Sequence, residues 1–502
     1  MQRLTRTFLL ALMVAGGAHQ AAAFSLLGNL ATWQTAALNY GWHITGTQNN
    51  IGGPQNIAEG YRWNQPTIYY AVDESFLKYF GQTGAAEIDK AVAVLNNLPP
   101  ASQINLNNYG LKTERINYQA QALGLLDLKT SALQSLVQEL GMGDPEQALF
   151  VLRTRWTTQF STNYYVINRN FDPSTFQSSA YINGDLWTFI TILDNQIVPI
   201  SAAIIQRVDP LAYGDPVTAD GNSGVSSINL VPRVGKFFLG FTRDDAASYR
   251  YLYNPLNLAV ENAPTNSFIP ALGTTLNLPV SGVGGFSGSP WLPVGATSGA
   301  TGTNWVPIVI STNAAAGLTN AAGTVSNLVV DVALRPGRDH IRFQKIQYDS
   351  LLGVTIDPFV DQFTDVYLTN GVLQSQNVLR IVTQPDIVFT AADLFSDGQD
   401  WLMMSRTTGW LNEAANNRSI NPNAFAADTG PGLVSPPVVI AFNWNTPAYW
   451  GVFLGPGAAF LSQDTVSIFP IWGSFDGSTN APVIYPSSLT FEQLEQRALR
   501  GP

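Results

Sequence analysis

Hydrophobic periodicity in the first third of the chain predicts a strand that is followed by a long helix. The run Thr67–Val72 is β-branched and aromatic, which is typical of a buried strand. Apolar residues then recur at the i, i+3, i+4, i+7 spacing of one helix face, at Ile88, Ala91, Val92 and Leu95. Thr83 or Gly84 can cap the start of this helix, and Pro99–Pro100 prevent its continuation.

Three further helix signals follow along the chain. Leu133, Leu136, Val137 and Leu140 repeat the helical spacing, and Gly141 is a fitting C-terminal cap for that helix. Asp144–Pro145 predict the start of a short helix, because Asp caps a first turn and Pro fits within it. Thr242 and Asp245 have the spacing of a capping box, ahead of a helix with Tyr249, Leu252 and Tyr253.

The remaining pattern favours strands and turns. Asn183–Gly184 predicts a type I′ turn in a hairpin. The stretch after His340 alternates imperfectly, which indicates a strand with a bulge, and Val438–Trp444 alternates cleanly. The segment Asn262–Val330 contains no Asp, Glu, Lys or Arg but has apolar pieces, so we expect short strands rather than a flexible linker.

The amino terminus changes this picture, because it has the features of a secretory signal peptide. Arg3 and Arg6 precede a short apolar core, and Ala21 and Ala23 occupy the positions of an A-x-A cleavage site. We therefore expect residues 1–23 to be removed after Ala23 and the protein to be secreted to the periplasm, the outer surface or the extracellular space. No later apolar run is long enough for a transmembrane span.

Composition limits the classes of partner. The formal net charge is −10, and it becomes −12 when Arg3 and Arg6 leave with the leader, so a nucleic-acid partner is not expected. The chain has no Cys, so it cannot form disulfides despite the predicted export. The sequence leaves two kinds of partner open, which are other copies of the same chain and an envelope or extracellular polymer.

Two stretches resemble parts of the matrixin-type metzincin domain. TIYYAVDESFLKYFGQTGAAEIDKAVAVLNNLP is similar to the opening strand and long helix of that family, and FTRDDAASYRYLYNP is similar to its closing helix. The resemblance implies an α+β fold with a zincin-like domain over residues 24–260. We expect the uncharged segment at 261–335 to follow, and then a β-rich, sandwich-like domain over residues 336–502.

The family's zinc chemistry needs the motif H-E-x-x-H-x-x-G-x-x-H, in which three His bind zinc and Glu activates water. This chain contains only His19, His43 and His340, and none of them lies between the two resembling stretches. His19 leaves with the predicted leader. The sequence thus argues against a zinc metalloprotease, and no cofactor is predicted.

Other candidate chemistry is incomplete. Ser287 in GFSGSP resembles the serine segment of trypsin-like proteases, but His43 lacks the expected context, so a Gly/Ser turn is the favoured interpretation. Asp428 begins a D-T-G without a second such motif. Asp357, Asp361 and Asp365 recur every fourth residue, and a solvated face is favoured over a glycosidase pair.

Structural calcium is an open alternative at Asp397 and Asp400, although their spacing does not fit an EF-hand. A second candidate group comprises Asp209, Asp215 and Asp220.

The leading hypothesis is an exported bacterial protein that acts by binding or assembly, with a metalloprotease-like domain that has lost its zinc site. A secreted hydrolase of peptide or glycan that uses carboxylates, and an extracellular glycan-binding module with the aromatic residues near Trp444, are the alternatives.

Overall fold

The computed structural model of the protein describes most of the first half of the chain and parts of the second. The described residues are 23–28, 53–54, 56–57, 60, 62–194, 201–209, 211, 234–262, 267–268, 332–369, 371–391, 404–407, 411–415, 417–418, 432–433, 437–442 and 471–486.

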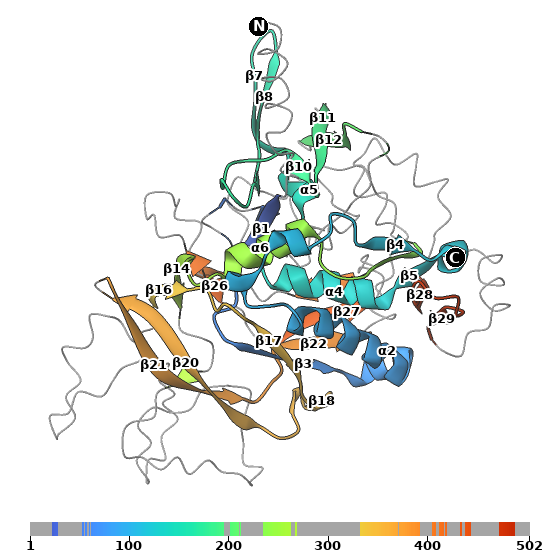
Figure 1. Ribbon diagram of the computed structural model, residues 1–502, viewed down its shortest axis with the longest axis vertical. Helices are drawn as coiled ribbons and strands as arrows, with labels where there is room; N and C mark the ends of the chain where they lie inside the picture. The colour runs from blue at the N-terminus through green and yellow to red at the C-terminus, as the bar shows by residue number, and fades with distance from the viewer. Residues whose placement is uncertain are drawn as a thin grey trace, which may run out of the picture.

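A five-stranded sheet forms the centre of the fold (Figure 1). Its order is β17 (Arg342–Lys345), β3 (Thr67–Val72), β22 (Ile387–Thr390), β27 (Val438–Phe442) and β23 (Met404–Thr407). The first four strands are parallel, and β23 runs antiparallel at the edge. The strands predicted at 67–72 and from Val438 are confirmed, and their side chains at Ile68 and Ile440 are fully buried, as is Phe389 on β22 between them.

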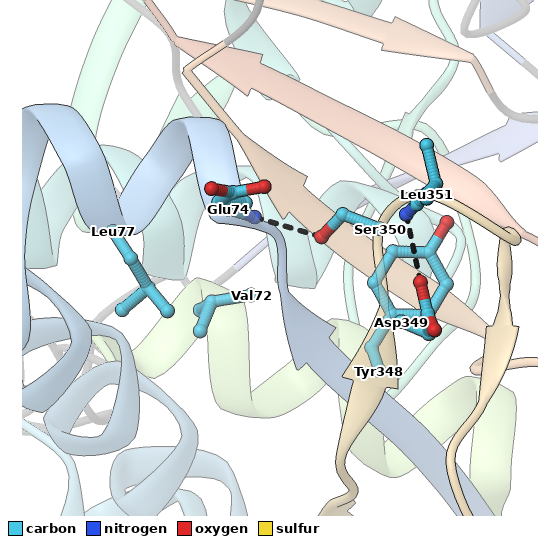
Figure 2. Close-up of a pocket in the computed structure, with 7 residues that line it drawn as sticks. All are labelled: Val72, Glu74, Leu77, Tyr348, Asp349, Ser350 and Leu351. Atoms are coloured by element: carbon cyan, nitrogen blue, oxygen red, sulfur yellow. Dashed lines mark hydrogen bonds between the residues drawn. The ribbon is translucent and has the colours of Figure 1, made fainter.

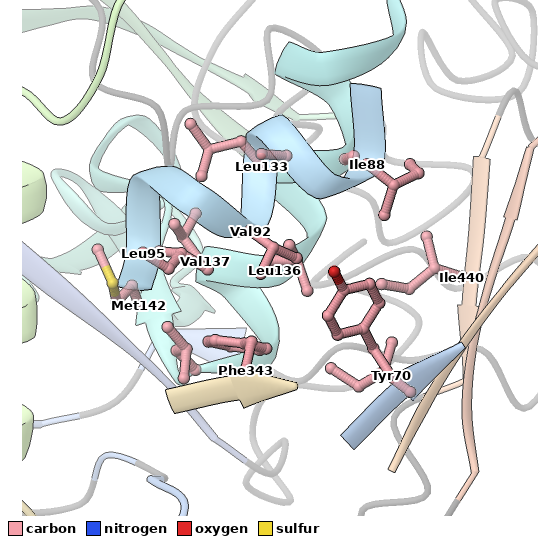
Figure 3. Packing of buried hydrophobic residues seen from close by; sticks show 14 of the residues in the cluster. Tyr70, Ile88, Val92, Leu95, Leu133, Leu136, Val137, Met142, Phe343 and Ile440 are labelled. Atoms are coloured by element: carbon pink, nitrogen blue, oxygen red, sulfur yellow. The ribbon is translucent and has the colours of Figure 1, made fainter. Parts of the chain in front are cut away.

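The long helix α2 (Glu74–Asn96) packs on β17, β3 and β22, and α4 (Leu128–Glu139) packs against α2 (Figure 3). Asp73 caps a first helical segment that begins at Glu74, so α2 starts earlier than predicted, and the predicted start at Thr83 or Gly84 lies close to the break from which the second segment runs. The helix is interrupted at Gly81, whose φ of 64° is open to glycine without strain. Phe76 and Phe80, in the turns before this break, are buried and anchor the earlier part to the core.

The other local predictions in this half are confirmed. Helix α5 (Pro145–Ala148) begins after the cap Asp144. Asn183 and Gly184 both have positive φ between β10 (Tyr181–Ile182) and β11 (Asp185–Asp194), as a type I′ turn requires. Helix α6 (Arg243–Tyr253) has the capping box that Thr242 and Asp245 predict.

A second, six-stranded sheet lies to one side of the central sheet (Figure 1). Its order is β15 (Ser267–Phe268), β21 (Val372–Val382), β20 (Phe359–Thr369), β16 (Val332–Pro336), β14 (Leu258–Asn262) and β25 (Asn417–Arg418). All of its pairings are antiparallel, and β20 and β21 form a hairpin that is paired along its full length.

The described chain also contains further strands and short turns of helix outside these two sheets. They are β1 (Phe24–Gly28), β2 (Gly53–Pro54), η2 (Ala101–Gln103), η3 (Leu106–Asn108), β4 (Glu114–Ile116), α3 (Tyr118–Ala122), β5 (Leu125–Asp127), β6 (Met142–Gly143), β7 (Val151–Thr157), β8 (Thr162–Ile167), β9 (Asn170–Phe171), β12 (Ser201–Arg207), β13 (Lys236–Phe238), β18 (Tyr348–Asp349), β19 (Val354–Thr355), β24 (Leu411–Ala415), β26 (Gly432–Leu433), β28 (Ile471–Ser474) and β29 (Val483–Ile484).

The mixed α+β class is confirmed. The central sheet takes β3 from before the uncharged segment and its other four strands from after it, so both predicted regions contribute to one layer. Most of the uncharged segment and the aromatic stretch after Phe442 lie outside the described residues. None of the helices within the described ranges has the length and apolar character that a membrane crossing requires.

Candidate binding site at the carboxyl end of the central sheet

A pocket of about 330 Å³ opens where β3 ends and α2 begins. Its lining residues are Val72, Glu74, Leu77, Tyr348, Asp349, Ser350 and Leu351 (Figure 2). Strand β3 has β17 on one side and β22 on the other, and both follow it in the chain, so the strand order reverses direction at β3. Ligands of open parallel sheets bind at the carboxyl ends of the strands next to such a reversal.

The inner side of the pocket is fixed by the cap of α2. The Asp73 carboxylate accepts a hydrogen bond from the Phe76 amide at 2.7 Å, and the Asp73 amide donates to the Phe389 carbonyl at 2.9 Å. The Ser75 and Thr390 hydroxyls lie 2.7 Å apart, which joins the same turn to the end of β22. The helix start is therefore held to the end of the neighbouring strand.

The outer side is a tight turn that follows β17. The Asp349 carboxylate accepts hydrogen bonds from the Leu351 amide at 2.9 Å and the Leu352 amide at 3.0 Å. Gly353 has a φ of 70° and donates its amide to the Asp349 carbonyl at 2.8 Å. The Glu74 amide donates to the Ser350 hydroxyl at 2.8 Å, so this turn and the first turn of α2 form one wall (Figure 2).

The electrostatics of the pocket are acidic. Burial raises the pKa of the Tyr348 hydroxyl, and the charges of Asp73 and Asp349 raise it further. The phenol consequently stays neutral and can donate a hydrogen bond. Glu74 forms an ion pair with Lys78 at 2.8 Å, and both side chains are mostly exposed. Such an exposed pair contributes little to stability and is easily exchanged for another partner.

The rim of the pocket is apolar. Leu351 is 91% exposed, and Leu352 and Ile356 close to it in the chain are also exposed. Large exposed apolar side chains that gather at a pocket are typical of a binding surface. The arrangement can thus hold a ligand by apolar contact, with hydroxyl and carboxylate groups within reach.

Most of the candidate residues that the sequence suggested lie in parts of the chain that the structure does not describe. Asp397, Asp400, Ser287, His43 and Asp428 lie outside the described residues. Within the described part of the chain, no group of three or more His, Asp or Glu side chains could hold a metal ion. His340 lies just before β17, and burial together with Arg342 lowers its pKa.

The three aspartates at every fourth residue do not share a solvated face. Asp357 is exposed and lies before β20, whereas Asp361 and Asp365 are on this strand, and the Tyr69 hydroxyl bonds to Asp361. Asp365 is fully buried, so its predicted solvent exposure is wrong. The reason is a pair of arginines that neutralise it.

Asp365 belongs to a buried ion cluster between β14, β16 and β20. The Arg335 guanidinium donates to both carboxylate oxygens of Asp365, with its Nη2 at 3.1 Å, and Arg338 donates to the same carboxylate at 3.1 Å. Arg62 donates to the Glu261 carboxylate at 2.5 Å and to the Arg335 carbonyl at 2.9 Å. These contacts attach the second sheet to the segment that leads into β3, which is a structural role.

The residues of the pocket were not predicted from the sequence. Asp73 and Glu74 directly follow a predicted strand, which is where a parallel sheet places its binding residues, and this signal could have been used. Tyr348 and Ser350 gave no such signal, because only the parallel pairing of β17 with β3 brings them to Glu74.

Comparisons with known proteins give no match. No protein-family model fits the chain, and no curated protein or solved structure is significantly similar to it.

Proposed function

We propose that this is an exported bacterial protein that acts by binding an envelope or extracellular polymer at the pocket beside α2. The fold that carries this pocket is a zincin-like frame without a zinc site. The signal-peptide pattern before Phe24 supports the export, and the missing H-E-x-x-H motif supports a role other than zinc-dependent cleavage.

The observation that carries the proposal is the open pocket with the exposed Leu351 at its rim, where Asp349 and the neighbouring Asp73 already have structural partners and Glu74 is the remaining carboxylate. Asp73 caps α2, and Asp349 holds the turn that bears Leu351. Carboxylates that are committed to backbone amides are poor candidates for general acid and base, because a hydrolase needs both groups directed at the substrate. The same hydrogen bonds make the pocket rigid, which favours binding.

The order of the central sheet supports the zincin-like part. Four parallel strands, one antiparallel edge strand and a long helix directly after the opening strand agree with the resemblance of residues 67–99. The resembling segment at α6 also packs into the same apolar cluster, through Tyr249 and Tyr253. The two stretches that suggested the frame therefore contribute to one apolar cluster.

The test is a co-sedimentation assay of the secreted protein with purified peptidoglycan sacculi and with insoluble polysaccharides. We expect saturable binding to one of these polymers, and Leu351→Ser to weaken it about tenfold because the leucine rim is lost. Leu256→Ser is the matched control, since Leu256 is 89% exposed but does not line the pocket, and it should bind as the wild type does.

The assay also separates binding from catalysis. Incubation of the same polymers and of a peptide library, with and without EDTA, should release no product. Turnover that Glu74→Gln abolishes would favour the carboxylate hydrolase instead. Equal weakening by Leu351→Ser and Leu256→Ser, or no binding at all, would contradict the assignment of the pocket.

A further inference from the structure

The hairpin of β7 and β8 projects away from the two large sheets and carries an exposed aromatic ring at its tip (Figure 1). Phe160 lies in the turn that connects the strands and is 91% exposed, and Tyr165 on β8 is 54% exposed. Neither ring belongs to the buried apolar clusters of the described chain. Packing within the described part of the fold therefore does not account for aromatic residues at this position.

The turn that bears Phe160 is held by its own hydrogen bonds. The Thr158 amide donates to the Ser161 carbonyl at 2.7 Å, and the Thr158 hydroxyl accepts from the amides of Ser161 at 3.1 Å and Phe160 at 3.4 Å. Backbone amides without a partner are costly in a hydrocarbon layer. This turn can consequently enter an apolar layer with these amides already satisfied.

The charge of this region is opposite in sign to that of the whole chain. The formal net charge is −10, yet residues 147–171 contain no Asp, Glu or Lys and carry Arg153, Arg155 and Arg169. The strand that lies against β7 is β12, which contains no acidic residue either. A cationic hairpin on an acidic protein is complementary to an anionic surface.

Strand spacing sets the arginine and the ring at the two depths that a lipid surface requires. Arg155 lies two residues before Thr157, whose pairing with Thr162 is the pair nearest the tip, so it is about 7 Å further from the turn. The polar headgroup layer outside the hydrocarbon is about 5–8 Å thick on each side of a bilayer. Tyr165, paired with Thr154, is about 10 Å from the same point, where amphipathic rings favour the membrane–water interface.

We propose that the tip of the β7–β8 hairpin binds the surface of an anionic lipid bilayer. The ring of Phe160 enters the boundary between headgroups and acyl chains, and Arg153 and Arg155 attract the lipid phosphates. The proposed export brings the chain to the membranes of the envelope. The residues of the hairpin do not line the pocket beside α2, so binding to lipid is separate from binding to a polymer.

A flotation assay tests this proposal with the secreted protein. It is mixed with vesicles of phosphatidylglycerol and phosphatidylethanolamine, and separately with vesicles of phosphatidylcholine. We expect binding to the anionic vesicles that weakens as salt rises from about 0.05 M to about 0.5 M, because the headgroup charges are then screened. Phe160→Ser should weaken this binding about tenfold. Leu256→Ser, which removes a similarly exposed side chain outside the hairpin, should not weaken it.

Two further pairs of variants test the charge and the insertion. Arg155→Gln should weaken binding about fivefold, whereas Arg115→Gln, on the exposed part of β4, should leave it unchanged. The chain has no Cys, so one introduced thiol can be labelled with a polarity-sensitive dye. On anionic vesicles the emission of the label at Gln159→Cys should rise and shift to shorter wavelength. The label at Thr479→Cys, in an exposed stretch between β28 and β29, should not respond.

The outcomes are distinct. Preference for the anionic vesicles that depends on Phe160 and Arg155 supports the proposal. Equal affinity for phosphatidylcholine, a silent label at Gln159→Cys, or equal weakening by Phe160→Ser and Leu256→Ser overturns it. Self-association that depends on Phe160 in the absence of vesicles would assign the tip to a second copy of the chain and also overturns it. Phe160→Ser should still sediment with the polymer that the wild type binds, which distinguishes failure of the hairpin from failure of the pocket.

Discussion

The two large sheets are stabilised by different means. In the central sheet, β22 is fully buried, and its Ile387 and Phe389 pack in the apolar cluster that includes residues of α2. The second sheet instead buries Arg335, Asp365 and Glu261 near its junction with the rest of the fold. Apolar packing tolerates gradual change, whereas a buried ion cluster depends on every partner being present. Buried ion pairs therefore attach the second sheet to the rest of the fold, whereas apolar packing stabilises the central sheet.

Loss of the Asp365 carboxylate should have the largest effect on the free energy of unfolding. Asp365→Ala leaves Arg335 and Arg338 buried without their carboxylate, so we expect the free energy of unfolding to fall by about 3–5 kcal/mol. Asp357→Ala, on an exposed residue two positions before the same strand, should change it by less than about 0.5 kcal/mol. Urea denaturation measures both, and similar losses for the two variants would show that the cluster does not stabilise the second sheet.

Among the described residues the buried Asp127 has no ion-pair partner whereas Asp365 has two, and a change of pH should distinguish them. Burial, with a smaller contribution from Glu87, raises the pKa of Asp127 at the start of α4 from 3.8 to about 7. The native state thus keeps a proton that the unfolded state loses, so the free energy of unfolding falls as the pH rises from about 4 to about 7. The fall is at most about 4 kcal/mol.

Asp127→Asn is the matching variant, because Asn also caps helices well. The decrease between pH 4.5 and 7.5 should be smaller in this variant than in the wild type when both are unfolded with urea. Identical pH profiles would show that Asp127 is ionised in the native state throughout this range.

A small change in the central sheet sharpens the contrast. Ile440→Val removes one methylene group from a fully buried position on β27, so we expect a loss of about 1 kcal/mol in the free energy of unfolding. The same urea titration applies. A loss as large as that of Asp365→Ala would mean that the central sheet does not absorb small changes in volume.

Local chemistry explains which elements the sequence predicted. The strand at Thr67–Val72, the Asn183–Gly184 turn and the Thr242 cap each depend on residues that are adjacent in the chain, and all three are confirmed. The turns of α2 before the break at Gly81 were not predicted, and Phe76 and Phe80 hold them against the core. Propensity alone does not reveal such tertiary support.

Long-range pairing explains what the sequence could not give. Asp365 looked like a surface residue, because the arginines that neutralise it lie on β16 and just after it. The pocket needs the turn after β17 to meet α2, and no periodicity encodes that meeting. The two halves of both sites become neighbours only when the sheets assemble.

The separation of β3 from its partners has a consequence for biosynthesis. The two neighbours of β3 are β17, which begins at Arg342, and β22, which begins at Ile387, so both are synthesised long after β3. The next strand, β27, is complete only at Phe442. The first strand of the sheet must wait with both edges unpaired while most of the polypeptide is made. Folds whose contacts are so distant form slowly, and an export pathway that carries unfolded chains would use this delay, since the sheet can close after the whole chain has crossed.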